Sequence, residues 1–125
     1  MEQNKVLIKG MRNRRNNDIW IDGRQLLPGY SLTIRNHSLD GFNWGYGGSG
    51  PAQAALAILL KVLGDKWLAL ELYQHFKWEY AGKWPVDGDF QELVDFDEFL
   101  ARHPEEVQRA SKRRKVDSWF NEAED

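Results

Sequence analysis

The sequence predicts an α+β fold: a small antiparallel β-meander packed on a helical hairpin, with a C-terminal helical segment. Three observations support this. Short segments near the N-terminus alternate apolar and polar residues between turn residues, which is typical of half-buried strands. Residues 51–63 are almost wholly apolar, and a second helical pattern with a regular apolar stripe follows. Only Gly64 and Asp65 separate these two stretches, so we expect a tight hairpin of helices.

The meander accounts for the first 35 residues. Lys5 to Met11 alternates and is predicted to be a strand. Residues 19–21 and 24–26 flank Asp22-Gly23, a dipeptide that favours a two-residue hairpin turn. Tyr30 to Arg35 alternates again, with Leu32 and Ile34 on one side, and is predicted to be a further strand.

The helical hairpin has recognisable end signals. Pro51 is suited to the first helical position, which makes Gly50 the expected N-cap, and Gln53 falls where its side chain can reach back toward that cap. Gly64 suits a left-handed C-terminal position, and Asp65 is the expected cap of the second helix.

The C-terminal part of the sequence is less regular. Residues 90–94 are predicted to form a short edge strand, followed by a helical turn that ends near Leu100. Residues 1–103 are expected to form one globular α+β domain. Residues 104–125 have few apolar positions and are expected to be a charged helix or a partly disordered arm.

Composition limits the classes of function. A chain of 125 residues suits one domain, and without cysteine it can form no disulfide, thiolate nucleophile or cysteine-ligated zinc site. The formal net charge of −2 gives no pull toward nucleic acid or anionic membrane, so we expect neither as a partner. The start of the chain lacks an apolar signal core, and its longest apolar run is too short to cross a bilayer. We therefore expect a soluble, cytoplasmic protein without a cofactor.

The most distinctive segment is the glycine-rich loop, residues 41–50, which leads directly into the apolar helix. We expect positive φ at Gly47 or Gly48, because glycine adopts it without strain and lets the backbone approach another group closely. A loop of this kind directs free N–H groups and the positive end of the helix dipole toward one point, which suits an anion. The Walker signature and the parallel unit of dinucleotide-binding folds are missing. The alternative is a purely structural loop whose glycines let the backbone pass beneath Trp44 and Tyr46.

The loop hypothesis names a set of ligand-binding residues. Arg35 would supply a charge-assisted contact to a phosphate-bearing or nucleotide-like ligand, and Trp44 or Tyr46 would stack on it. The alternative for the segment around His37 is local turn capping. The predicted ligand-binding residues are Arg35, His37, Trp44, Tyr46, Gly47, Gly48, Ser49, Gly50 and Gln53.

This segment also carries a resemblance. Residues 42–53 read FNWGYGGSGPAQ, and residues 35–38 read RNHS. Together they resemble the signature of domain-of-unknown-function family 6166, a family of bacteria and phages. The resemblance covers roughly Lys5 to Leu100. It implies the fold and the importance of the loop, and no activity, because the family has none assigned.

No catalytic or metal-binding constellation stands out in the sequence, so we expect neither an enzyme nor a metal site. His37, His75 and His103 lie far apart in the sequence, in different predicted elements. Glu71 and His75 are one helical turn apart and are predicted to form a surface contact.

The C-terminal arm supports a second class of function. Residues 102–116 carry six Lys or Arg and two Glu, a net charge of +4, whereas residues 117–125 carry four acids and no base, a net charge of −4. Trp119 and Phe120 are two large aromatic residues within this polar segment and are predicted to bind a partner. On this alternative the protein is a phage- or bacterium-encoded interaction or inhibitory protein that modulates a host system through an aromatic surface and a charged tail.

Overall fold

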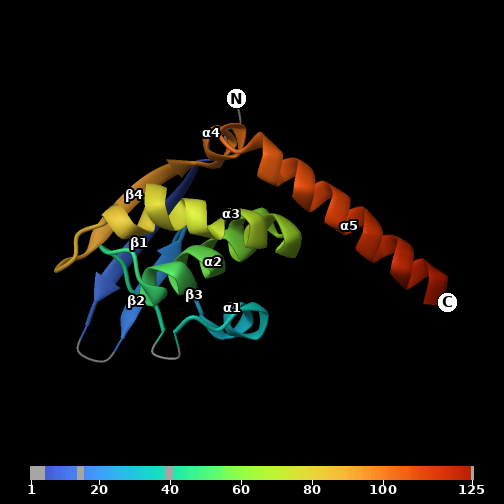
Figure 1. The fold of residues 1–125 in the computed structure, drawn as a ribbon. Helices are drawn as coiled ribbons and strands as arrows, with labels where there is room; N and C mark the ends of the chain where they lie inside the picture. The colour runs from blue at the N-terminus through green and yellow to red at the C-terminus, as the bar shows by residue number, and fades with distance from the viewer. Residues whose placement is uncertain (1–4, 14–15, 39–40, 125) are drawn as a thin grey trace.

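The computed structural model describes the backbone of residues 5–13, 16–38 and 41–124, and the side chains of these residues as far as Trp119. It confirms the α+β class, with a four-stranded antiparallel sheet packed on helices (Figure 1). The elements are β1 Lys5–Arg12, β2 Asn17–Ile21, β3 Arg24–Leu26, α1 Gly29–Ile34, α2 Ser49–Leu63, α3 Lys66–Glu79, a 3-10 turn Ala81–Lys83, β4 Phe90–Asp95, α4 Phe96–Ala101 and α5 Pro104–Glu124.

The sheet has the strand order β3-β2-β1-β4, so β4 is an edge strand, as predicted. Asp22 and Gly23 both have positive φ, 48° and 82°, and form the predicted two-residue turn between β2 and β3. One face of the sheet covers the core with Ile8, Ile19, Ile21, Leu26, Phe90 and Val94. The opposite face carries Leu7, Met11, Trp20 and Leu93, of which Met11 and Leu93 are exposed.

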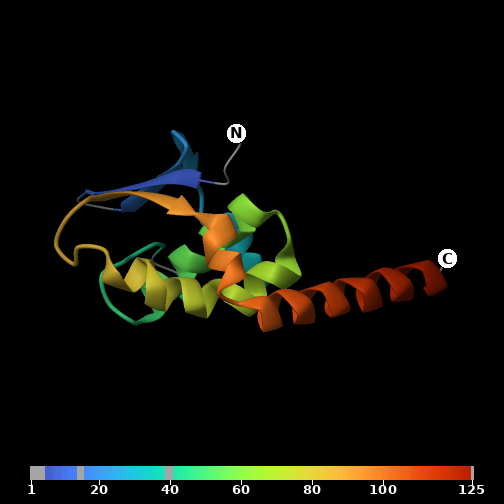
Figure 2. The same ribbon diagram turned by 90° about the horizontal axis from the view of Figure 1, so that it is seen from above.

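The helical hairpin forms the second layer, and α2 lies at its centre (Figure 2). Every residue of α2 from Gly50 to Leu60 is buried. Gly64 ends α2 in the left-handed conformation, with φ of 64°, and the Asp65 side chain accepts hydrogen bonds from the first turn of α3. Both end signals of the hairpin are therefore confirmed. The start of α2 differs slightly from the prediction, because Gly48 takes the N-cap position and the helix includes Ser49 and Gly50.

The predicted strand at residues 30–35 is wrong, because this segment forms the short helix α1. Its apparent alternation rests on Leu32 and Ile34 alone. Ser31 and Thr33 each donate a side-chain hydrogen bond to the carbonyl three residues back, a local bond that favours a helical turn. Ser31 is buried and also accepts a hydrogen bond from Gln53 of α2, so a contact with α2 holds this turn in place.

The C-terminal segment is one long helix, α5. Its first half lies against α3, where Ala110 is fully buried. Its second half runs away from the rest of the molecule, as Figures 1 and 2 show from two directions. Across the part of the chain that the structure describes, no helix combines the length and the apolar character needed to cross a membrane.

Candidate functional site

The glycine-rich loop is built by close packing, and only part of this follows the prediction. The prediction of positive φ at Gly47 or Gly48 is wrong. Among the loop residues, positive φ occurs at Gly41 and Gly45. Gly48 is extended, with φ of −95°. A Cβ atom at Gly47 would lie 2.6 Å from the Trp78 ring, and one at Gly48 would lie 2.5 Å from the Tyr46 ring. These two glycines therefore make room for aromatic rings, and the reason is steric rather than conformational.

Gly45 is where the backbone itself passes closest to another segment. Its φ is 90°, and its N–H donates to the carbonyl of Ala81 at 2.9 Å. A Cβ atom here would lie 2.5 Å from the Cα atom of Val86 and 2.9 Å from the carbonyl oxygen of Trp84. The close approach that the loop glycines suggested thus exists at Gly45, and its partner is the segment before β4.

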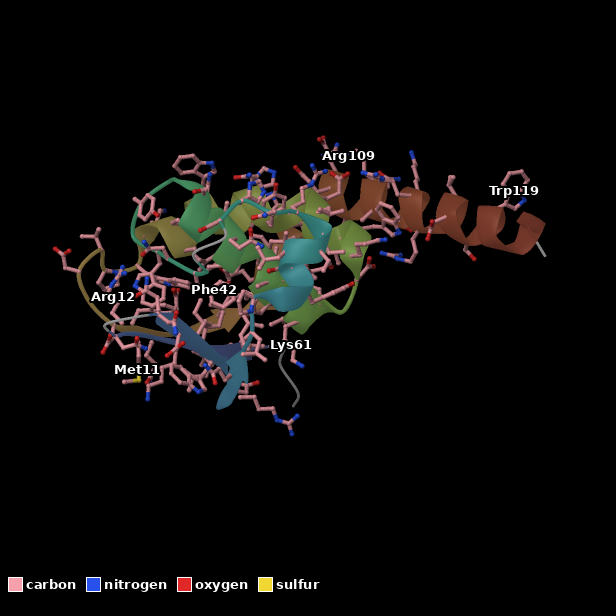
Figure 3. All side chains as sticks on the ribbon, turned by 90° about the horizontal axis from the view of Figure 1, so that it is seen from below. Met11, Arg12, Phe42, Lys61, Arg109 and Trp119 are labelled. Atoms are coloured by element: carbon pink, nitrogen blue, oxygen red, sulfur yellow. The ribbon has the colours of Figure 1, made fainter. Side chains whose placement is uncertain are left out.

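Arg12, at the end of β1, fastens this loop to the segment before β4. Its guanidinium donates to the Asn43 side chain at 2.8 Å and to the Trp44 carbonyl at 3.1 Å, and also to the carbonyls of Gly88 and Pro85 at 3.1 and 3.3 Å. It also lies over the Trp44 ring, 4.5 Å from the centroid. Figure 3 shows Arg12 next to the loop that carries Phe42. Sequence reasoning missed this residue, because Arg12 stands at the start of a polar run that is typical of a solvated turn.

We expect Arg12→Met to lower the free energy of unfolding by about 2–4 kcal/mol, because hydrogen bonds to a charged group contribute about 1.5–3 kcal/mol each and are not additive. Arg24→Met, at an exposed position of β3, removes the same charge and should change stability by less than about 0.5 kcal/mol. Urea denaturation of both variants is the measurement. Equal stability of the two variants would show that the Arg12 contacts contribute nothing.

Trp44 is fully buried, so its ring is not available to stack on a ligand. It packs edge-on against Phe90, with centroids 4.8 Å apart, and its indole N–H donates to the Gly88 carbonyl at 3.0 Å. This placement matches the structural alternative for the loop, in which the glycines serve the packing around Trp44.

Gln53 is also fully buried, and each of its side-chain polar atoms has partners in the protein. Its Oε1 accepts from the backbone N–H groups of His37 and Ser38, at 2.7 and 3.3 Å. Its Nε2 donates to the Ser31 hydroxyl at 2.9 Å and to the Arg35 carbonyl at 3.1 Å. The predicted reach back toward the helix cap is therefore wrong, and Gln53 instead fixes the segment between α1 and the loop.

The structure brings His37 close to α3 rather than to the loop. Its Nε2 lies 2.8 Å from the Tyr73 hydroxyl. Burial lowers the pKa of His37 below its usual value, and the positive charges of Arg35 and Lys77 lower it further. His37 is therefore a neutral hydrogen-bonding partner of Tyr73 at neutral pH. Arg35 is exposed, and its backbone carbonyl is occupied by Gln53.

The exposed part of the loop consists of Tyr46, Gly47 and Ser49, with Trp78 beside them. A cation that contacts it is Lys77, a buried residue that sequence reasoning did not single out. Its Nζ donates to the Gly47 carbonyl at 3.1 Å and lies 4.4 Å from the centroid of the Trp78 ring. Lys77 thus stabilises the loop in the same way as Arg12, through backbone oxygen atoms.

The two residues predicted to bind a partner lie near the far end of α5. Trp119 is 65% exposed, and Figure 3 shows it at the tip of the helix, well away from the sheet and the loop. The side chain of Phe120 lies outside the described residues. The predicted ligand-binding and partner-binding residues therefore lie at opposite ends of the molecule.

The predicted contact between Glu71 and His75 is wrong, because both residues have partners on α5. Glu71 accepts from Arg109 at 3.0 Å, and the Nε2 atom of His75 lies 3.0 Å from Glu106. His75 and His103, which are far apart in the sequence, have ring centroids only 4.3 Å apart. The sequence does not indicate these contacts with α5 or the approach of the two histidine rings, because both depend on how α5 crosses α3.

Comparison with curated proteins and with solved structures gives no match. The model of one protein family matches residues 8–102, a span that contains most of the sheet, the helical hairpin and the loop that Arg12 fastens. All of α5 lies beyond this span. On this match the chain belongs to the family of unknown function DUF6166.

Proposed function

We propose that the protein is a protein-interaction module that works through α5, pairing it antiparallel with the α5 helix of a second copy. The observation that carries this proposal is the exposure of every residue from Lys112 to Trp119. A short polar helix is marginally stable in water. Val116 and Trp119 are 54% and 65% exposed, and this apolar surface becomes buried when a partner covers the helix.

The charge pattern of α5 favours a second copy as that partner. Residues 102–116 carry a net charge of +4 and residues 117–125 a net charge of −4. An antiparallel pair places each block beside the opposite block of the other copy, whereas a parallel pair places like charges together. A contact of this kind is isologous, so one patch provides both sides of the interface.

A groove at the base of the exposed part suits the aromatic residue of the second copy. Trp67, Lys112, Arg113 and Val116 line a cavity of about 320 Å³ where α5 leaves α3. An antiparallel pair centred on Val116 places Trp119 of the second copy at this groove. The Arg113 guanidinium already lies 4.6 Å from the centroid of the Trp67 ring, and a second indole there adds a further cation–π contact.

The anion-binding hypothesis for the loop stays a prediction, and the geometry of the loop supports it less than the exposed surface of α5 supports a protein interaction. Trp44 and Gln53 are fully buried and bonded within the protein. The helix dipole alone contributes about 0.3–1 kcal/mol to anion binding, which is too little for useful affinity. The exposed aromatic surface of α5 therefore favours the protein-interaction hypothesis.

Exchanging charges between the two blocks tests the pairing. We expect the wild type to be a dimer at low salt and to dissociate as the salt concentration rises, because exposed charges are screened. We expect Lys112→Glu with Lys115→Glu, or Asp117→Lys with Glu122→Lys, to give monomers. A mixture of these two double variants should form a heterodimer, because residues 102–125 then carry a net charge of −4 in the first variant and +4 in the second. Sedimentation velocity measures all three outcomes.

The matched control is Lys61→Glu with Lys83→Glu, which makes the same change in net charge at exposed positions outside α5 and should stay dimeric. A wild type that is monomeric up to about 1 mM, corresponding to less than about 4 kcal/mol of binding free energy, would contradict the proposal. Dimers that persist in both α5 variants would place the contact elsewhere.

A further inference from the structure

Two histidines and two glutamates meet where α5 begins on α3. His75 and Glu79 lie one turn apart on the same face of α3. His103 directly precedes α5, and Glu106 lies in its first turn. The rings of His75 and His103 face each other with an interplanar angle of 32°. Segments that are distant in sequence thus bring four side chains with metal-ligating atoms to one place.

Donor atoms from three side chains of this cluster, those of His75, Glu79 and His103, are close enough to share one ion. The Nε2 atom of His103 lies 2.6 Å from Oε2 of Glu79, and that of His75 lies 3.0 Å from Oε2 of Glu106. One donor atom from each of His75, Glu79 and His103 lies within 4.8 Å of the other two. Tetrahedral zinc with bonds of about 2.0–2.2 Å places its ligand atoms roughly 3.3 Å apart, which falls within this range.

Two arginines orient the carboxylates from outside the cluster. Arg102 donates to Oε1 of Glu79 at 2.8 and 3.0 Å, so Oε2 is directed toward His103. Arg109 lies 3.7 Å from Oε2 of Glu106 and also bonds to Glu71. Contacts of this kind are the outer shell that holds metal ligands in position.

Both carboxylates are charged at neutral pH, as metal ligands must be. Burial raises the pKa of Glu79, but the hydrogen bonds from Arg102 and His103 outweigh burial, so the pKa lies below the usual value. A hydrogen bond from its own backbone lowers the pKa of Glu106, and the nearby His75 and Arg109 lower it further.

We propose that His75, Glu79 and His103 bind one Zn²⁺ ion, which fastens the base of α5 to α3, and that Glu106 orients the His75 ring from beside it. Imidazole and carboxylate donors without thiolate suit zinc or a neighbouring transition metal better than calcium or magnesium. A cation bound to the ring nitrogen atoms of both imidazoles also reaches the Glu79 carboxylate. The His75 side chain is 43% exposed, so an ion can enter from solvent. This site goes beyond the proposed pairing of α5 and does not depend on it.

Titration of chelator-treated protein with zinc chloride, followed by calorimetry, tests the site. We expect one ion to bind per chain and the melting temperature to rise. The ring signals of His75 and His103 should shift in NMR spectra, while those of His37, which lies elsewhere, should stay in place. Cobalt(II) should give the intense visible absorption of tetrahedral coordination.

Variants assign the ligands. We expect His75→Gln and Glu106→Gln each to weaken zinc binding by at least about tenfold, since even outer-shell changes cost about 10–100-fold. Glu105→Gln makes the same charge change one residue away, at an exposed position, and should bind like the wild type. Absence of zinc binding in the wild type would overturn the proposal. Unchanged affinity in both His75→Gln and Glu106→Gln, or equal weakening in Glu105→Gln, would overturn it as well.

Discussion

Gly45→Ala is expected to lower the free energy of unfolding by about 2–6 kcal/mol. The φ of 90° at this position is strained for any residue with a side chain, at a cost of about 1–3 kcal/mol. The added methyl group would lie 2.5 Å from the backbone of Val86, and overpacking of this kind costs about 1–3 kcal/mol more. Because the obstacle is backbone rather than a flexible side chain, the loop cannot relax without moving the segment before β4. Urea denaturation followed by tryptophan fluorescence measures the loss.

Gly64→Ala is the matched control for this variant. Gly64 also has positive φ, 64°, but a Cβ atom there would meet nothing within 4 Å. Only the conformational cost of about 1–2 kcal/mol should remain. Equal losses in the two variants would mean that the contact with Val86 has no energetic consequence and that the loop moves freely.

Gln53→Leu is expected to lower the free energy of unfolding by about 3–6 kcal/mol. Leucine nearly fills the space but leaves the N–H of His37 and the carbonyl of Arg35 without the bonds that Gln53 provides. Each buried polar group left unsatisfied costs about 1–3 kcal/mol. The Ser31 hydroxyl loses its donor as well, so α1 should loosen together with the segment that follows it.

Two measurements separate this effect from a general loss of stability. Hydrogen exchange at the amides of His37 and Ser38 should accelerate more in Gln53→Leu than exchange within the sheet. Gln74→Leu, at an exposed position of α3, should change stability by less than about 0.5 kcal/mol. Normal protection of both amides in Gln53→Leu would show that other groups satisfy them.

Local signals predicted much of the fold correctly. The Asp22-Gly23 turn, the Gly64 end of α2 and the Asp65 cap of α3 each depend on the chemistry of a few neighbouring residues. Because α2 is apolar on nearly all sides, it was expected to lie at the centre of the core, where the structure places it. The segment 30–35 was predicted incorrectly because its short pattern fits either a strand or a helical turn, and a contact with Gln53, distant in sequence, holds it as a helix.

The candidate sites were predicted less well, for a related reason. The sequence correctly singled out the glycine-rich loop as a place of close packing, but it did not show which glycine faces backbone and which faces an aromatic ring. Trp44 was expected to meet a ligand and instead lies in the core. An aromatic residue in a polar segment has the same local sequence pattern whether its ring contacts a ligand or lies in the core.

The sequence by itself determined the fold class, the helical hairpin and the charge division of α5, because composition, periodicity and end signals act over a few residues. Only the tertiary structure decided that Arg12 and Lys77 stabilise the loop, that Gln53 satisfies the segment after α1, and that His75 meets His103. These contacts join residues far apart in the chain, and their geometry depends on how whole elements pack. Side chains that contact a carbonyl or a ring at such crossings have no local signature, since the partner that gives them a role comes from another part of the chain.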